Sequence, residues 1–307
     1  MSTSKWNIFR SEYVRRVGRV FLAAVRALGE RDAMVHAAAL AFFTGLSFAP
    51  LLVILISIAG MIGTDVQGEI VDEVGALIGP NAREAIDLVL DNVEAQKLSA
   101  TVPALLGVIT LLFSATAVFA QLQTSMNRIW NIEVTSGHGV WIWLRKRLLS
   151  LGMVLAIGFL LLVSLGVSAA LAVVLSEESL PWRIANFAVS FLVFVTVFAL
   201  IFKFLPDAKI EWRDVWVGAF VTALLFGVGK SAIGTYLGYS TVGSAYGVAG
   251  SLIVLLIWVY YSSVILFFGA ELTQVYAALF GSHIEPEDYA DWADGDPAKT
   301  IRKRLRK

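Results

Sequence analysis

The chain has 307 residues, of which 58% are hydrophobic and 16% are charged, and its 24 basic side chains balance its 24 acidic ones. Soluble proteins carry about 25% charged residues, so this composition is that of a membrane protein. The zero net charge gives no sign of a nucleic-acid-binding surface. With no cysteine, the chain has no disulfide, no thiolate nucleophile and no cysteine-ligated metal.

Long stretches of the chain lack Asp, Glu, Lys and Arg altogether. These stretches are residues 33–64, 98–127, 148–176 and 184–202, and residues 215–270 contain Lys230 alone. A helix that crosses a bilayer needs about 20 apolar residues, and in lipid a helix satisfies its own backbone hydrogen bonds. We therefore predict an all-α, polytopic membrane helix bundle. Its six transmembrane helices are expected at residues 36–62, 101–128, 147–175, 182–204, 214–238 and 247–276.

The first 32 residues form an amphipathic arm. Its apolar residues recur every three or four positions, with arginines between them: Phe9, Tyr13, Val17, Phe21, Ala24 and Leu28. Such a helix can lie on an anionic inner leaflet, and it can equally pack its apolar face on the bundle. Both interpretations stay open at this point.

The Lys and Arg counts of the loops predict the orientation. The arm carries seven Lys and Arg residues, the loop between the second and third helices carries four, and the loop between the fourth and fifth helices carries three. The loops after the first, third and fifth helices carry two, one and no such residues, and the tail carries six. Both termini are therefore expected in the cytoplasm, with residues 33–280 as the transmembrane domain.

Two further segments lie outside the expected helices. Residues 64–99 carry two apolar stripes that Gly79-Pro80-Asn81 separates, which predicts an extracytoplasmic helical hairpin between the first two membrane helices. It is either a lid over a cavity or a structural cap. The tail, residues 281–307, is acidic and then basic with few apolar residues, so we expect it to be disordered and cytoplasmic.

Polar groups within the apolar segments are costly and therefore informative. Glu271 ends the last helix near the cytoplasm, and we predict that it forms a cytoplasmic polar cluster with His36, Asn127 and Arg128. A structural clasp is one interpretation of this cluster and a proton relay is the other. Pro50 is expected to kink the first helix.

Lys230 lies on the fifth helix, towards its outer end, where it can snorkel to the interface or face a polar cavity and contact an anion. The helices around it are rich in glycine, with GxxxG spacing that permits close packing. The residues expected to border a substrate path are Lys230, Gly234, Tyr236, Tyr246, Gly247 and Gly250.

A search for catalytic chemistry is negative. The three histidines, His36, His138 and His283, form neither an HExxH motif nor a close metal-binding pair. We assign no catalytic residue, no metal site and no cofactor, and we expect the protein not to be an enzyme.

Four ordered motifs resemble the YihY/virulence factor BrkB family. They are His36–Pro50, Leu122–Asn131, Phe204-Leu-Pro206 with Trp212 and the glycine-rich stretch to Tyr236, and Tyr246–Gly250 with Leu256–Tyr261 and Gly269–Leu272. The resemblance implies a six-helix protein of the bacterial inner membrane. An older nuclease label of this family supplies no catalytic residue, whereas a connection of some members with envelope lipid or lipopolysaccharide export implies lipid handling.

The leading hypothesis is thus a transporter or lipid-translocating protein for an anionic envelope lipid or solute. The alternative is a non-transporting scaffold for cell-envelope assembly, which would bind a protein partner. A membrane nuclease is the weakest interpretation. The expected partners are membrane lipids, above all anionic lipids of the inner leaflet, and no nucleic acid.

Overall fold

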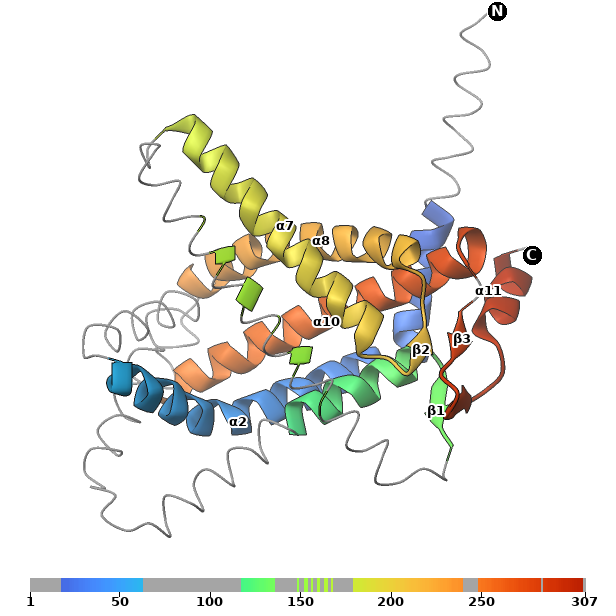
Figure 1. Cartoon of the computed structure of the whole chain (residues 1–307), viewed down its shortest axis with the longest axis horizontal. Coiled ribbons are helices and arrows are strands. Elements are labelled where there is room, and N and C mark those ends of the chain that lie inside the picture. Colours follow the sequence, from blue (N-terminus) through green and yellow to red (C-terminus); the bar gives the residue numbers. More distant parts are fainter. Residues whose placement is uncertain are drawn as a thin grey trace, which may run out of the picture. The chain divides into compact units, whose positions relative to one another are not determined.

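The computed structural model describes residues 18–62, 117–135, 179–239, 248–282 and 284–305, with isolated helical positions between 148 and 167 (Figure 1). For residues 48–62 and for several helix ends it describes the backbone alone. The chain divides into two compact units. The first comprises Met1–Ala33, Gln123–Gly227 and Ile265–Lys307, and the second comprises Met34–Leu122 and Val228–Val264.

Four long helices match the predicted membrane helices closely. They are α2 (Ala33–Ile62), α7 (Leu180–Phe204), α8 (Trp212–Tyr239) and α10 (Val248–Phe280). Residues 18–30 and 117–129 are also helical. α7, α8 and α10 contain segments that are long and apolar enough to cross a membrane: Leu180–Phe204, Trp212–Ile233 and Leu252–Phe280.

Local chemistry explains where several helices begin and end. The Ser179 side chain caps α7 by accepting a hydrogen bond from the Trp182 amide at 3.3 Å. Asp32, with φ 52°, separates the helix at residues 18–30 from α2, and Asn131, with φ 58°, follows the helix at residues 117–129. Aspartate and asparagine tolerate this left-handed conformation better than other residues with a side chain.

Two short antiparallel strand pairs join loops that are far apart in sequence. β1 (Ile132–Val134) pairs with β4 (Ala290–Trp292), with Glu133 opposite Asp291. β2 (Ala208–Lys209) pairs with β3 (Glu285–Pro286). The tail therefore contributes one strand to each pair, and it continues into α11 (Pro297–Leu305).

The prediction of a disordered tail at residues 281–307 is thus wrong for residues 284–305. Ile284 and Ala290 are buried, at 8% and 7% exposure. The amide of Glu287 donates a hydrogen bond to the carbonyl of Asp207 at 3.0 Å. Composition suggested disorder because the tail has too few apolar residues to form a core alone. It folds because the loops after the second and fourth predicted helices offer it backbone partners.

In the first unit, α8 and α10 approach each other through a reciprocal pair of small residues. Gly218 of α8 faces Thr273 of α10, and Gly269 of α10 faces Thr222 of α8. A Cβ atom on Gly218 would lie 1.6 Å from Thr273 Oγ1, and one on Gly269 would lie 1.8 Å from Thr222 Oγ1. Each threonine hydroxyl donates to the carbonyl of the glycine four residues before it, at 2.7 Å in both helices. Small residues of this kind permit close helix packing in lipid.

Aromatic side chains connect α7 and α8, while other large apolar side chains of both helices are exposed. Phe191 contacts Phe220 edge to face at 5.3 Å between ring centroids, and Phe198 contacts Phe226 at 5.6 Å. Phe187 of α7 is 68% exposed, and Val228 of α8 is 64% exposed. Exposed apolar surface of this extent indicates contact with lipid.

The second unit is described by α2, the first half of α10 and the last part of α8. Ala41 of α2 packs with Leu255 and Val259 of α10 in a buried apolar cluster. α2 continues without a break through Pro50, and the kink expected there stays a prediction. The hairpin predicted at residues 64–99 lies outside the described residues.

Candidate functional site

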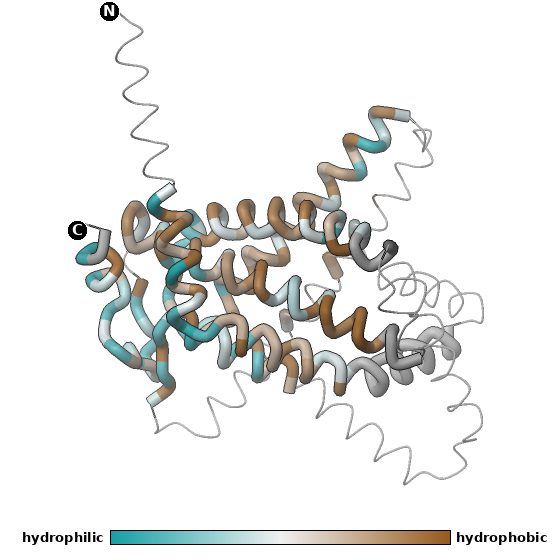
Figure 2. Tube along the Cα trace, turned by 180° about the vertical axis from the view of Figure 1, so that it is seen from behind, coloured by the Kyte–Doolittle hydropathy of each residue, from teal (hydrophilic) through white to brown (hydrophobic). Residues whose placement is uncertain are grey.

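The polar residues of the first unit gather around the end of α10. We call the described residues 18–32, 127–135, 205–211 and 281–305 the polar cap. Figure 2 shows hydrophilic positions concentrated at the strands and at α11, in contrast to the largely hydrophobic long helices. The four segments of the cap come from the arm, from two loops and from the tail.

A buried ion pair joins the arm to α10. Arg31 Nη1 lies 2.9 Å from Glu271 Oε2, and the Glu271 side chain is fully buried while that of Arg31 is 19% exposed. The same Arg31 nitrogen also donates to the Gln274 side chain and to the carbonyl of Ile129. One guanidinium therefore connects the arm, α10 and the end of the helix at residues 117–129.

Near this ion pair, several buried polar atoms have no hydrogen-bond partner among the described residues. They are Glu271 Oε1, Gln274 Nε2 and Trp130 Nε1. Buried polar atoms are nearly always hydrogen-bonded, to protein or to ordered water. The carboxylate of Glu271 thus relies on Arg31 for its stabilisation.

Asp207 organises a second network, which binds the tail. Its carboxylate accepts hydrogen bonds from Asn127 Nδ2 at 2.7 Å and from the Tyr289 hydroxyl at 2.9 Å. Its amide donates to Asn127 Oδ1 at 2.9 Å. Asp207 is only 3% exposed, so hydrogen bonds replace the water that its charge has lost.

Two further contacts hold the tail. Asp214, at the start of α8, accepts hydrogen bonds from the Ser282 amide at 3.0 Å and hydroxyl at 2.8 Å. Lys209 forms an exposed ion pair with Asp288. The hydrogen bond from Lys209 to Asp288 is the main cause that raises the pKa of Lys209, and the negative charges of Asp288, Glu287 and Glu285 add to it.

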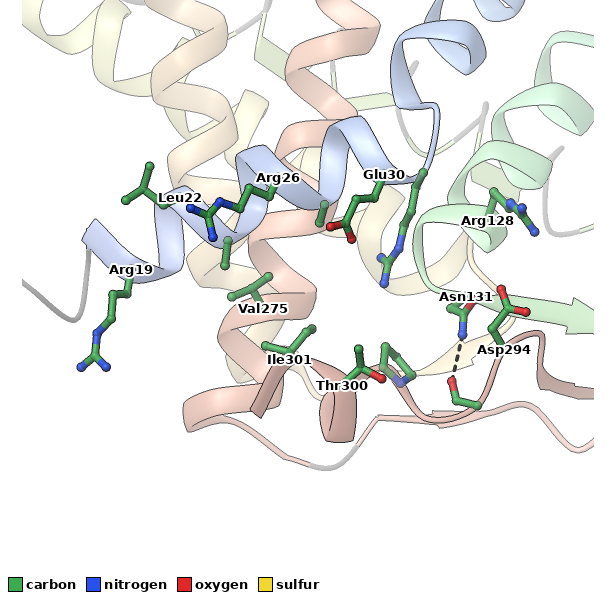
Figure 3. A pocket seen from close by; sticks show the side chains of 15 residues that line it. Arg19, Leu22, Arg26, Glu30, Arg128, Asn131, Val275, Asp294, Thr300 and Ile301 are labelled. Atoms are coloured by element: carbon green, nitrogen blue, oxygen red, sulfur yellow. Dashed lines mark hydrogen bonds between the residues drawn. The ribbon is translucent and has the colours of Figure 1, made fainter. Parts of the chain in front are cut away.

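An open cavity of about 500 Å³ lies between the helix at residues 18–30, the end of α10 and α11. In Figure 3, Arg19, Arg26 and Glu30 extend from the arm helix, while Thr300 and Ile301 come from α11. Arg128, Asn131 and Asp294 complete one end of it. The dashed line in the figure joins Asn131 Nδ2 to the Gly295 carbonyl at 2.8 Å, which fixes this end of the cavity.

The cavity wall carries four arginines and two carboxylates. Arg31 is neutralised by Glu271. The other three, Arg19, Arg26 and Arg128, have no side-chain hydrogen bond or ion pair with the described part of the chain. Free guanidinium groups bind carboxylates and phosphates through paired N–H donors. The arrangement is therefore suited to an anion.

Aromatic residues mark a boundary close to the cap. Trp212 stacks on Trp216 and contacts Phe204 edge to face, with ring centroids 6.0 and 5.9 Å apart. Lys203 Nζ lies 5.9 Å from the centre of the Trp212 ring. Tryptophan and lysine at the end of an apolar helix are typical of the membrane–water interface.

The residues predicted to form the cytoplasmic cluster fall into different places. Glu271 binds Arg31, Asn127 binds Asp207, and Arg128 lines the cavity. Glu271 and Asn127 thus take part in two hydrogen-bond networks and Arg128 lines the cavity, and the single cluster stays a prediction. His36 lies on α2 in the second unit, and its membership of the cluster stays a prediction.

The residues predicted to border a path lie in the second unit. Lys230 is exposed on α8 and has no hydrogen bond or ion pair among the described residues. For Gly234, Tyr236 and Gly250 the structure describes the helical backbone only. Tyr246 and Gly247 fall outside the described residues, so the path stays a prediction.

Sequence reasoning missed three features of the site. From the sequence, Arg31 is only one of the basic residues that set the topology, and nothing in the sequence motifs singles out Asp207 or Tyr289. Asp207 directly follows the Phe204-Leu-Pro206 motif, and a carboxylate beside an apolar helix end was a usable signal. The spacing Gly-x-x-x-Thr, which occurs at Gly218–Thr222 and again at Gly269–Thr273, was a second one.

Comparison with known proteins identifies the class. The family model described as Virulence factor BrkB matches residues 24–290. The chain therefore belongs to the Virulence factor BrkB family, and it is a multi-pass membrane protein. This confirms the family resemblance that the sequence motifs predicted.

Several curated relatives carry the name UPF0761 membrane protein. The relative from Bordetella petrii is 29% identical over 277 residues, which cover 85% of this chain and 58% of the relative. The relative from Haemophilus influenzae is 26% identical over 77% of this chain and 87% of its own length. That from Pasteurella multocida is 30% identical over 69% of this chain and 67% of its own length.

The chain thus spans about half of the length of some relatives, with 45% of the one from Verminephrobacter eiseniae matched. No solved structure matches the chain significantly.

Proposed function

We propose that this protein spans the bacterial inner membrane six times, with both termini in the cytoplasm, and moves an anionic lipid or solute of the cell envelope. The observation that carries the proposal is the open cavity of the polar cap, where Arg19, Arg26 and Arg128 form no ion pair with a carboxylate of the described residues. A binding site for an anion needs cations that are not already neutralised.

The contacts between the four segments of the polar cap support the predicted orientation in the membrane. The Lys and Arg counts predict that the arm, the loop after the second helix, the loop after the fourth helix and the tail share the cytoplasmic side. In the first unit these four segments contact one another through Arg31, through β1–β4 and through β2–β3. Segments that contact one another must lie on one side of a membrane, so the contacts agree with the charge counts.

Lys230 supports a path on the spanning part of α8. A lysine within an apolar segment is costly unless it reaches water, an interface or an anion. Lys230 is exposed and has no partner among the described residues. Its side chain is therefore available to attract an anionic group.

Reconstitution into lipid vesicles tests the transport activity. Purified protein is inserted into vesicles of phosphatidylethanolamine and phosphatidylglycerol that contain a trace of fluorescent phosphatidylglycerol, and an impermeant quencher reports lipid movement between leaflets. We expect the fluorescent lipid to move between leaflets faster with the unmodified protein than in protein-free vesicles. With the Lys230→Ala variant we expect it to move more slowly than with the unmodified protein. A matched control is Lys299→Ala, which changes an exposed lysine of α11. Movement no faster than in protein-free vesicles would reject the proposal.

A protein that moves no lipid would favour the scaffold alternative, and crosslinking in intact membranes should then capture a stoichiometric protein partner.

The orientation has its own test. Reporter fusions after residue 80 and after Lys307 should report opposite sides of the membrane. Reporters on the same side would contradict the six-span arrangement.

A further inference from the structure

We infer that the cavity of the polar cap binds the phosphodiester head group of a membrane phospholipid. The inference deepens the proposed function and rests on it for the anionic character of the ligand. It adds the chemical class of that ligand and the residues that bind it.

The charges of the wall select a phosphodiester. With Arg31 paired to Glu271, three arginines remain against Glu30 and Asp294. One cation is therefore in excess, which matches the single negative charge of a phosphodiester. A group with two negative charges would leave one of its charges unneutralised, and the carboxylates of Glu30 and Asp294 would repel it.

The carboxylates have a role of their own in this arrangement. Phospholipid head groups carry hydroxyl or ammonium groups next to the phosphate. Glu30 and Asp294 lie in the same wall as the arginines, so they can accept hydrogen bonds from such groups. Arginines and carboxylates around one cavity thus fit a head group that contains both an acceptor and a donor.

The apolar part of the wall favours a lipid over free phosphate. Leu22 and Ile301 line the cavity together with the charged residues. On the same arm helix Phe21 is 49% exposed and Val25 is 45% exposed. A helix that combines arginines with exposed apolar side chains is typical of the membrane surface. A lipid would place its head group at the arginines and its glycerol backbone along the apolar wall.

The test measures binding without transport. Full-length protein is delipidated in detergent, and native mass spectrometry records its binding of dihexanoyl-phosphatidylglycerol and dihexanoyl-phosphatidylethanolamine. Inorganic phosphate and dihexanoylglycerol, which lack the lipid and the phosphate part respectively, are the comparison ligands. We expect both phospholipids to bind more tightly than either comparison ligand. Equal binding of inorganic phosphate, or of dihexanoylglycerol, would overturn the inference.

Variants assign the binding to the cavity. The double variant Arg26→Gln/Arg128→Gln should weaken phospholipid binding at least about tenfold, because each lost arginine removes a charged hydrogen-bond donor. Arg183→Gln, which removes an exposed arginine at the start of α7, should bind as the unmodified protein does. An unchanged dissociation constant in the double variant would overturn the assignment.

A second variant guards against misfolding of the first. Ile301→Trp narrows the cavity from α11 without changing any charge, and it should weaken binding as well. Its unfolding temperature is measured beside that of the double variant. The outcome also separates the two proposals: phospholipid binding without lipid movement in vesicles would retain the site and reject the transport.

Discussion

The polar cap of the first unit and the α2–α10 contact of the second unit are held together in different ways. In the cap, charged side chains bond across elements, as Arg31 does to Glu271 and Asp207 does to Asn127. In the second unit, Ala41, Leu255 and Val259 pack through apolar contacts. The hydroxyl of Ser263 donates to the carbonyl of its own helix at Val259.

This difference predicts how strongly substitutions in each region lower the stability of the protein. Buried charges fix a unique arrangement, because any other arrangement leaves a charge without a partner. Apolar contacts between helix faces tolerate changes as long as volume is roughly kept. We therefore expect substitutions in the cap to have larger effects than comparable ones in the second unit.

The largest effect is expected from Arg31→Met. The change leaves Glu271 buried without its cation, and breaking a buried ion pair in this way costs about 3–5 kcal/mol. Unfolding of the purified protein in detergent, followed by circular dichroism against denaturant, measures it. The double variant Arg31→Met/Glu271→Gln should regain most of the loss, because no buried charge remains. A single variant as stable as the unmodified protein would show that the pair contributes nothing.

The glycine of the α8–α10 contact comes next. Gly269→Ala places a Cβ atom 2.9 Å from Thr222 Cβ and 3.0 Å from Phe202 Cζ, as well as against the Thr222 hydroxyl. Overpacking of this kind costs about 1–3 kcal/mol. The unfolding temperature of the purified variant checks it.

Two glycines serve as matched controls for that variant. Gly227→Ala on α8 meets no atom within 4 Å. Gly45→Ala in the second unit meets the end of the flexible Leu256 side chain, with Cδ2 at 2.8 Å and the next side-chain atom, Leu256 Cγ, at 3.8 Å. Both should change stability by less than about 1 kcal/mol, since alanine favours the helix. If Gly45→Ala destabilised as much as Gly269→Ala, the α8–α10 contact of the first unit would be no more sensitive than the α2–α10 contact of the second unit.

A smaller effect is expected from Tyr289→Phe. The variant removes the hydroxyl that donates to Asp207 at 2.9 Å, while Asn127 still binds the same carboxylate. One hydrogen bond to a charged group is worth about 1.5–3 kcal/mol when fully buried, and partial exposure of Tyr289 lowers this to about 1 kcal/mol. Trypsin cleaves after Lys and Arg, and α11 of the tail contains several of them. A tail that is held less firmly should therefore be cut faster in the variant. Cleavage at an unchanged rate would show that the Tyr289 hydroxyl contributes nothing to holding the tail.

The smallest effect is expected from Lys209→Gln, because its ion pair with Asp288 is exposed to water. The pKa of Lys209 is raised in the folded protein. The pair therefore contributes below the ordinary lysine pKa of 10.5 and is lost as the pH rises above it. At pH 7, where the pair is formed, the variant should unfold only slightly more easily than the unmodified protein, and the two should coincide above the pKa of Lys209. A clear loss of stability at pH 7 would mean that the tail depends on this contact.

Much of the fold was predictable because lipid imposes a simple rule on sequence. The runs without charges predicted α2, α7, α8 and α10 to within a few residues. The site was less predictable. Glu271 was recognised as a buried polar residue, but its partner Arg31 lies 240 positions away in the chain, and sequence spacing carries no information on such a contact.

The sequence by itself determined the membrane character, the family and most helix boundaries, because apolar length and charge position follow directly from the cost of placing charge in hydrocarbon. Only the tertiary structure decided which polar groups meet. It folded the tail onto Asp207, paired Arg31 with Glu271 and placed Arg19, Arg26 and Arg128 around a cavity without an ion pair to any described residue. These outcomes depend on contacts between segments that are distant in the chain, and hydrogen bonds and ion pairs act only at short range in space.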